Sequence, residues 1–292
     1  MITYVSLVIT TLFWGGTFIA GRTLADSVPP ANAAFLRFAI ATLVLVILAR
    51  LIDGKIAIPP RKEWWSLLLL GMTGVFSYNI LFFNGLQHIE AGRASLIIAL
   101  NPLAITLSSV IFLGERLTFK QCIGILISLI GAVFVISNGH PSAIMSGGFG
   151  IGEAAILGCV ASWTAYSVIG RSVLRSISPL AAVFYSSLIG TLLLFPLVLI
   201  NNSINEILFY SISDWTSLIF LGLFGTAIGF SLYYHSIRKI GASRCSVFIN
   251  LVPFFSILLS WFILKESIKL SVLVGGLILL SGVYLTNSSA KR

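Results

Sequence analysis

Polar and aromatic side chains that could bind a solute occur inside stretches of this chain that are otherwise apolar. Trp14 and Arg37 lie in two such stretches near the N-terminus, and Trp163 and Tyr166 lie in another in the second half. Indole and phenol rings can hold apolar or cationic groups, and a guanidinium can bind a carboxylate or phosphate through paired hydrogen bonds. The chemistry that these residues offer is therefore recognition of a small solute.

Nine residues are our candidates for substrate binding because polar groups in hydrocarbon are costly unless they are paired or face water. They are Trp14, Arg37, Tyr78, Asn79, Asn101, Trp163, Tyr166, Tyr233 and Asn250. Two interpretations stay open: most of them face one central cavity, or they hold helices together by packing and hydrogen bonds. Small residues beside the first tryptophan, Gly15, Gly16 and Ala20, predict that a neighbouring helix approaches closely there.

Arg37 is the base that we expect inside a helix. It lies about seven residues, or roughly 10 Å, below the outer end of that helix, and an arginine at a helix centre costs about 2.5–3.5 kcal/mol on insertion scales. The equivalent position in the second half of the chain is Ser186. Arg37 therefore either snorkels outward or forms a structural tie to helix-end carbonyls or Glu153, or its guanidinium faces a cavity and clamps a carboxylate or phosphate of the substrate.

The residue patterns that enzymes need are not present in the sequence. The chain has nine acidic residues, none spaced Asp-x-x-x-Asp, and three scattered histidines. Its three cysteines have no paired spacing for a disulfide framework or metal site, and GGFGIG (147–152) lacks the Lys-Ser/Thr of a phosphate-binding loop. We predict no cofactor, no metal and no enzymatic activity. An intramembrane enzyme is the alternative from another class.

The composition indicates that transmembrane helices position the candidate substrate-binding residues. Of 292 residues, 58% are hydrophobic and 9% charged, against about 25% charged in soluble proteins. Each apolar stretch is long enough to cross about 30 Å of hydrocarbon. We predict an all-α integral membrane protein with ten transmembrane helices, at residues 3–22, 31–50, 64–87, 92–113, 119–137, 151–171, 179–200, 215–237, 244–264 and 270–287.

The basic residues predict how these helices are oriented. With the N-terminus in the cytoplasm, thirteen Lys and Arg residues fall on the inner side and four on the outer side. Bases concentrate on the cytoplasmic side of membrane proteins, so we predict a multi-pass protein of the inner (plasma) membrane with both termini cytoplasmic. This explains the net charge of +9 without a nucleic-acid partner. Glu115 and Glu266 end their helices beside bases, and we expect them to pair with those bases.

The two halves of the chain repeat each other. Trp14 and Pro30 align with Trp163 and Pro179 at an offset of 149, and from Trp64 and Trp215 onward the offset is 151. Each repeat holds five helices, an odd number, so the second enters the membrane inverted. We predict repeats at residues 1–138 and 150–287, joined through the Gly/Ser/Pro-rich stretch 138–150.

These repeats resemble the EamA-type branch of the drug/metabolite transporter superfamily. Each opens with an aromatic–tryptophan–small pattern, FWGG and SWTA. Each also carries a mid-helix proline, an apolar run and a terminal glutamate, in ASLIIALNPLAITLSSVIFLGERLT and CSVFINLVPFFSILLSWFILKESIK. The resemblance implies a ten-helix permease of two inverted repeats, often an exporter of amino acids or small metabolites.

The leading function is therefore a secondary transporter that works by alternating access, with a small-molecule substrate and the lipid bilayer as partners. An exporter of amino acids or related compounds is our first expectation, and an uptake permease for another metabolite is the alternative. The sequence leaves substrate identity, direction, ion coupling and oligomeric state open.

Overall fold

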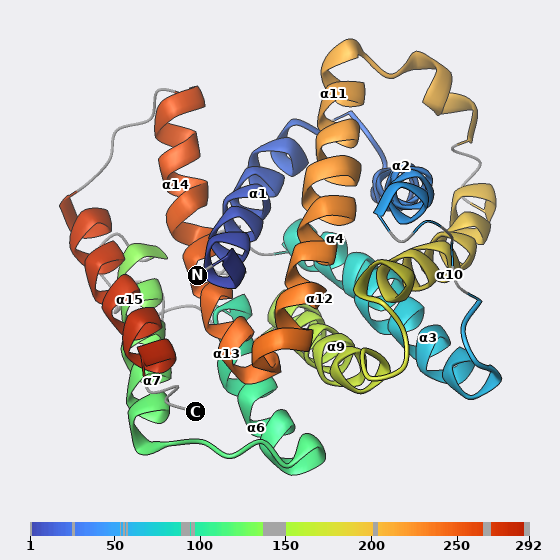
Figure 1. Cartoon of the computed structure of the whole chain (residues 1–292). Coiled ribbons are helices and arrows are strands. Elements are labelled where there is room, and N and C mark those ends of the chain that lie inside the picture. Colours follow the sequence, from blue (N-terminus) through green and yellow to red (C-terminus); the bar gives the residue numbers. More distant parts are fainter. Residues whose placement is uncertain are drawn as a thin grey trace.

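The computed structural model describes residues 2–24, 27–52, 54, 56, 58–88, 94, 97–136, 150–200, 204–264 and 270–288. Helices joined by turns make up this part of the chain, and no strand occurs in it (Figure 1). The all-helical prediction is confirmed. Most of the junction, residues 138–149, and Glu266 lie outside the described residues.

The first half contains α1 (Ile2–Leu24), α2 (Pro30–Ile52), η1 (Arg61–Glu63), α3 (Trp64–Leu70), η2 (Gly71–Ser77), α4 (Tyr78–His88), α6 (Asn101–Leu113) and α7 (Phe119–Ile136). The second contains α9 (Ile151–Val173), α10 (Pro179–Ile200), η3 (Ile204–Phe209), α11 (Ile212–Phe220), η4 (Leu221–Ile228), α12 (Gly229–Ile240), α13 (Ala242–Ser246), η5 (Val247–Asn250), α14 (Leu251–Leu264) and α15 (Leu270–Ser288). Among the described residues, seven helical stretches are long and apolar enough to cross a membrane, and three more apolar helices are shorter.

Two long helical stretches contain a π-helical segment at corresponding places. The segment η2 joins α3 to α4, and η4 joins α11 to α12. At the offset of 151, Gly71 at the start of η2 corresponds to Gly222 in η4, and Gly74 corresponds to Gly225. π-Helical turns are rare in proteins, and those that occur often lie at functional sites. The two segments therefore indicate where a functional site could be.

Contacts between helices occur in equivalent pairs across the two halves. Helix α1 packs on α12 and α14, and its counterpart α9 packs on α4 and α6. A Cβ on Gly71 would meet Ile189 of α10, and a Cβ on Gly222 would meet Ile40 of α2. Ile40 and Ile189 are themselves equivalent at the offset of 149. Each half therefore contacts the other through corresponding residues.

Helices α7 and α15 form a close pair, seen side by side at the left of Figure 1. A Cβ on Gly131 of α7 would overlap backbone atoms of Leu279, and a Cβ on Gly282 of α15 would overlap backbone atoms of Ser128. Small residues of this kind let membrane helices approach until their backbones touch. The same feature occurs on α1, where a Cβ on Gly15 would meet α14, as the sequence predicts.

The mid-helix prolines coincide with breaks in the helices. Pro102 is the second residue of α6, which follows a turn at residues 99–100, and Pro253 is the third residue of α14, which follows the 3-10 segment η5. Proline lacks an N–H and clashes with the carbonyl four residues earlier. Both halves therefore change helical geometry just before the equivalent proline.

Candidate functional site

Two tryptophans from the two halves meet inside the molecule. The rings of Trp14 on α1 and Trp163 on α9 lie 5.4 Å apart in an edge-to-face arrangement. Phe230 of α12 contacts both rings, at 5.9 and 5.2 Å, and Tyr233 contacts both at 5.2 and 5.8 Å. These distances are in the range preferred by aromatic pairs, so the four rings form one packed unit.

Two further predicted residues extend this unit. The ring of Tyr166 lies 5.2 Å from that of Trp163, and the ring of Tyr78 on α4 lies 5.6 Å from it. We call Trp14, Tyr78, Trp163, Tyr166, Phe230 and Tyr233 the aromatic cluster. Five of the nine predicted residues thus lie together, carried by four helices from both halves.

Glycines of η4 and α12 hold the first tryptophan in place. The Trp14 Nε1–H donates a 2.9 Å hydrogen bond to the Gly225 carbonyl oxygen, and a Cβ on Gly229 would lie 2.9 Å from the same nitrogen. Gly225 and Gly229 have the spacing of a small-residue packing motif of membrane helices, and the indole packs against them. Only 8% of Trp14 is exposed. The packing interpretation of Trp14 therefore has direct support, and a role in solute binding stays a prediction.

Arg37 bonds to η4, the segment that also accepts the hydrogen bond of Trp14. Its Nε–H donates a 2.8 Å hydrogen bond to Thr226 Oγ1 of η4, and its guanidinium carbon lies 5.2 Å from the Phe38 ring centre. These are the polar and cation–π interactions of the Arg37 side chain with the described residues, and a tie to Glu153 is not among them. The Glu153 carboxylate instead accepts a 2.8 Å hydrogen bond from the Gly150 N–H at the start of α9.

The three predicted asparagines are placed differently. Asn79 of α4 donates to the Val75 carbonyl oxygen at 2.6 Å, and Asn250 of η5 donates to Ser128 Oγ on α7 at 3.1 Å. Asn101 begins α6. All three bury a carboxamide oxygen that receives no hydrogen bond within the described part of the chain. Among the described residues, no hydrogen bond joins Asn101 or Asn250 to a residue of the aromatic cluster, and a role of these two in solute binding stays a prediction.

Sequence reasoning did not select two residues of this region, Phe230 and Thr226. A phenylalanine and a threonine in an apolar helix carry no pattern of their own. The repeat does offer one signal, because Phe230 is equivalent to Asn79 at the offset of 151, and Asn79 was already a candidate. Applying the offset to every candidate would have found Phe230.

The expectation that Glu115 pairs with neighbouring bases is wrong. Its carboxylate accepts a 2.6 Å hydrogen bond from Ser243 Oγ and a 3.2 Å hydrogen bond from the Ala242 N–H. Both groups lie at the start of α13, whose first N–H groups lack partners within the helix and attract negative charge. Glu115 therefore connects the end of α6 to the second half of the chain.

Comparisons with known proteins agree on a family. The profile of the EamA-like transporter family matches residues 1–137 and again residues 150–288. The chain is 30% identical to the uncharacterized transporter YyaM of Bacillus subtilis, over 99% of this chain and 94% of that protein. It is 28% identical to a probable terminal-alkyne amino-acid exporter of Streptantibioticus cattleyicolor, over 97% of this chain and 92% of that protein.

A solved crystal structure has the same fold. It covers 99% of both chains with a TM-score of 0.77 at 23% sequence identity, a level at which the likeness concerns the fold alone. The family match extends across both halves of the sequence and agrees with the motifs FWGG and SWTA from which the resemblance was inferred. The chain belongs to the EamA-like transporter family.

Proposed function

We propose that this protein is a secondary transporter that exports amino acids or related small metabolites across the inner membrane. The observation that carries the proposal is the meeting of Trp14 and Trp163 at the boundary between the two halves. In transporters built from repeats, the substrate path lies at the repeat interface. The aromatic cluster and Arg37 occupy that interface and supply groups that bind small organic solutes.

Equivalent contacts in the two halves support alternating access. We assign residues 1–138 and 150–287 to two inverted repeats of five membrane helices each. Gly71 against Ile189 and Gly222 against Ile40 are the same contact made once by each half. Two halves that can adopt each other's packing can open the path to one side and then to the other. Transport is then driven by a gradient of the substrate or of an ion.

Amino acids are the first substrate class to test for two reasons. The relative from Streptantibioticus cattleyicolor is named a probable exporter of a terminal-alkyne amino acid. In addition, an amino acid carries a carboxylate, which suits a guanidinium, and an ammonium group, which suits aromatic ring faces. Phe38 and Gly225 connect Arg37 to the aromatic cluster, so one amino acid could contact both.

The proposal predicts carrier-mediated movement of amino acids by the purified full-length protein. Proteoliposomes loaded with single labelled amino acids and small carboxylic metabolites should release at least one of them faster than protein-free liposomes, and the rate should saturate with concentration. The assay should be run with and without a pH gradient, which reports proton coupling. If no solute of the panel is released faster than from protein-free liposomes, with or without the pH gradient, amino-acid transport is contradicted.

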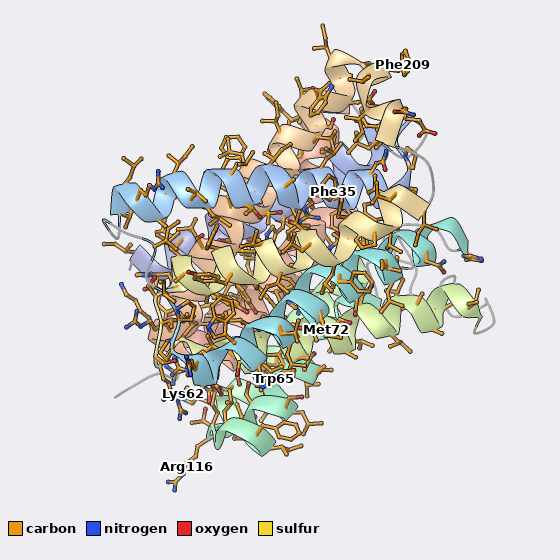
Figure 2. All side chains as sticks on the ribbon, turned by 90° about the vertical axis from the view of Figure 1, so that its right-hand side faces the viewer. Phe35, Lys62, Trp65, Met72, Arg116 and Phe209 are labelled. Atoms are coloured by element: carbon orange, nitrogen blue, oxygen red, sulfur yellow. The ribbon has the colours of Figure 1, made fainter. Side chains whose placement is uncertain are left out.

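The orientation we propose predicts which loops can be reached from each side. In a variant whose native cysteines are replaced by serine, Lys55→Cys and Arg292→Cys should react with a membrane-impermeant maleimide only after the cells are opened, and Met145→Cys should react in intact cells. Support comes from Lys62 and Arg116, exposed bases on one side of the molecule, opposite Phe209 (Figure 2). Reaction of positions 55 and 145 from the same side would exclude two inverted five-helix repeats.

A further inference from the structure

Arg37 carries a positive charge that has no anionic partner in the described part of the chain. It lies in α2, seven residues after Pro30, within a stretch that can span a membrane. Its contacts are the hydroxyl of Thr226 and the ring of Phe38. Both are neutral, and charged groups in membrane helices usually pair with a charge or mark a substrate path. No described residue supplies an anion to this charge, so an anion that binds beside Arg37 would compensate it.

The hydrogen bonds around Thr226 determine which face of the guanidinium can bind that anion. The Thr226 hydroxyl donates its single proton to the Leu221 carbonyl oxygen at 3.0 Å, so its oxygen accepts from Arg37 Nε. The Nε–H therefore already donates a hydrogen bond, and this bond fixes the orientation of the guanidinium. The two terminal nitrogens, Nη1 and Nη2, form no hydrogen bond with the described residues. They constitute the end-on fork with which arginine binds a carboxylate through two parallel hydrogen bonds.

The π-helical segment η4 brings this fork to the aromatic cluster. Thr226 bonds to the carbonyl of Leu221, five residues earlier, which is the spacing of a π-helical turn. A Cβ on Gly225 would lie 3.9 Å from Arg37 Nη2. The carbonyl oxygen of the same glycine accepts the Trp14 Nε1 hydrogen bond. Gly225 therefore has the fork on one side and the first indole on the other.

A second chain of contacts links Arg37 to the same rings. Its guanidinium lies over Phe38, and the Phe38 ring lies 6.2 Å from that of Phe230, a member of the aromatic cluster. A solute whose anionic group met the fork would place its remaining atoms against these rings.

We propose that the Nη1–Nη2 fork of Arg37, held by Thr226 beside Gly225, is the binding site for the carboxylate of the transported solute. This inference rests on the proposed transport function and adds to it a required chemical group. A single carboxylate balances the single charge of Arg37, whereas an amine without a carboxylate would add a second positive charge. Substrates are therefore monocarboxylates, with or without an ammonium group, and not simple amines.

The test compares ligands that differ in one group. We choose L-phenylalanine, 3-phenylpropionate, which lacks the ammonium group, and 2-phenylethylamine, which lacks the carboxylate. L-leucine, 4-methylpentanoate and isoamylamine form a second set. Dissociation constants are measured on the purified full-length protein by calorimetry, with melting temperature as a second readout. For at least one set we expect both carboxylates to bind about tenfold or more tightly than the amine.

Variants assign this preference to the fork. Arg37→Lys keeps the charge but loses the planar fork. The ratio of the amine's dissociation constant to that of the carboxylate should therefore fall about tenfold. Thr226→Val removes the hydroxyl that holds Nε and keeps the side-chain shape, so it should lower the ratio by less. Arg171→Lys is the matched control, because Arg171 binds the carbonyl oxygens of Ile237 and Arg238 at 2.7 and 2.6 Å. It should leave the ratio unchanged.

The outcomes separate this inference from the function on which it rests. Equal binding of amines and carboxylates, binding of no carboxylate, or an unchanged ratio in Arg37→Lys would overturn the fork as the carboxylate site. If Arg37→Lys does not fold, an unchanged ratio in Thr226→Val would overturn it instead. In each of these cases, the transporter proposal still holds if proteoliposomes that contain the protein move another solute of the panel.

Discussion

Replacing Gly131 by leucine is expected to prevent the protein from accumulating in a folded form. Gly131 of α7 faces the backbone of Leu279 on α15, and even a Cβ would overlap backbone atoms there. Additional methylenes in a packed interior usually cost about 1–3 kcal/mol. Here the obstacle is a helix backbone, which cannot rotate aside as a side chain can, so the two helices must separate along their length.

The measurement is the yield of monodisperse protein after detergent extraction, together with its melting temperature. Gly282→Leu should give the same loss, because Gly282 makes the equivalent contact with the backbone of Ser128. Gly21→Leu is the matched control: it changes a helical glycine in the same way, but no atom lies within 4 Å of the added Cβ. Wild-type yield and melting temperature for Gly131→Leu would contradict the close α7–α15 packing.

Much of the fold could be predicted from the sequence because hydrocarbon imposes strong rules on it. Runs of apolar residues between bases gave helix positions that agree with α1, α2, α9 and α10 within a few residues. The helices predicted at 92–113 and 244–264 are continuous, whereas the structure breaks both before Pro102 and Pro253, since proline cannot continue the hydrogen-bond pattern of a helix. The π-helical segments η2 and η4 were not predictable, since their extra residue per turn follows from contacts between helices and has no local pattern.

The site could be predicted in part, and the repeat explains which part. Trp14 and Trp163 are equivalent by the offset of 149, and equivalent residues near the boundary of two repeats meet each other, as they do here. Thr226 gave no signal because hydroxyl residues are common in membrane helices and bond to their own backbone. Glu115 was misassigned because neighbouring bases compete with distant backbone N–H groups, and only the folded chain brings α13 to it.

Replacing Trp14 by phenylalanine is expected to slow transport about tenfold or more while the protein still folds. Phenylalanine keeps an aromatic ring among Trp163, Phe230 and Tyr233. It removes the indole N–H that donates to the Gly225 carbonyl oxygen at 2.9 Å. A buried acceptor that loses its partner costs about 1–3 kcal/mol, and about 1.4 kcal/mol corresponds to a tenfold change in rate.

Transport is the sensitive readout because the lost bond joins α1 to η4, which also carries the partner of Arg37. The rate is measured in proteoliposomes with a solute that the wild-type protein moves, and folding is measured by yield and melting temperature. Trp65→Phe is the matched control, since Trp65 is 75% exposed on α3 and projects from the surface (Figure 2); it should transport like wild type.

Trp14→Ala does not separate the two roles, packing and solute binding, that the sequence left open for this residue. Loss of the whole indole from the core should cost about 3–5 kcal/mol, so this variant should accumulate poorly whichever role Trp14 has. The phenylalanine variant therefore decides between them. If Trp14→Phe folds and transports at the wild-type rate, the indole N–H is not needed for transport and Trp14 only fills the interface between the two halves.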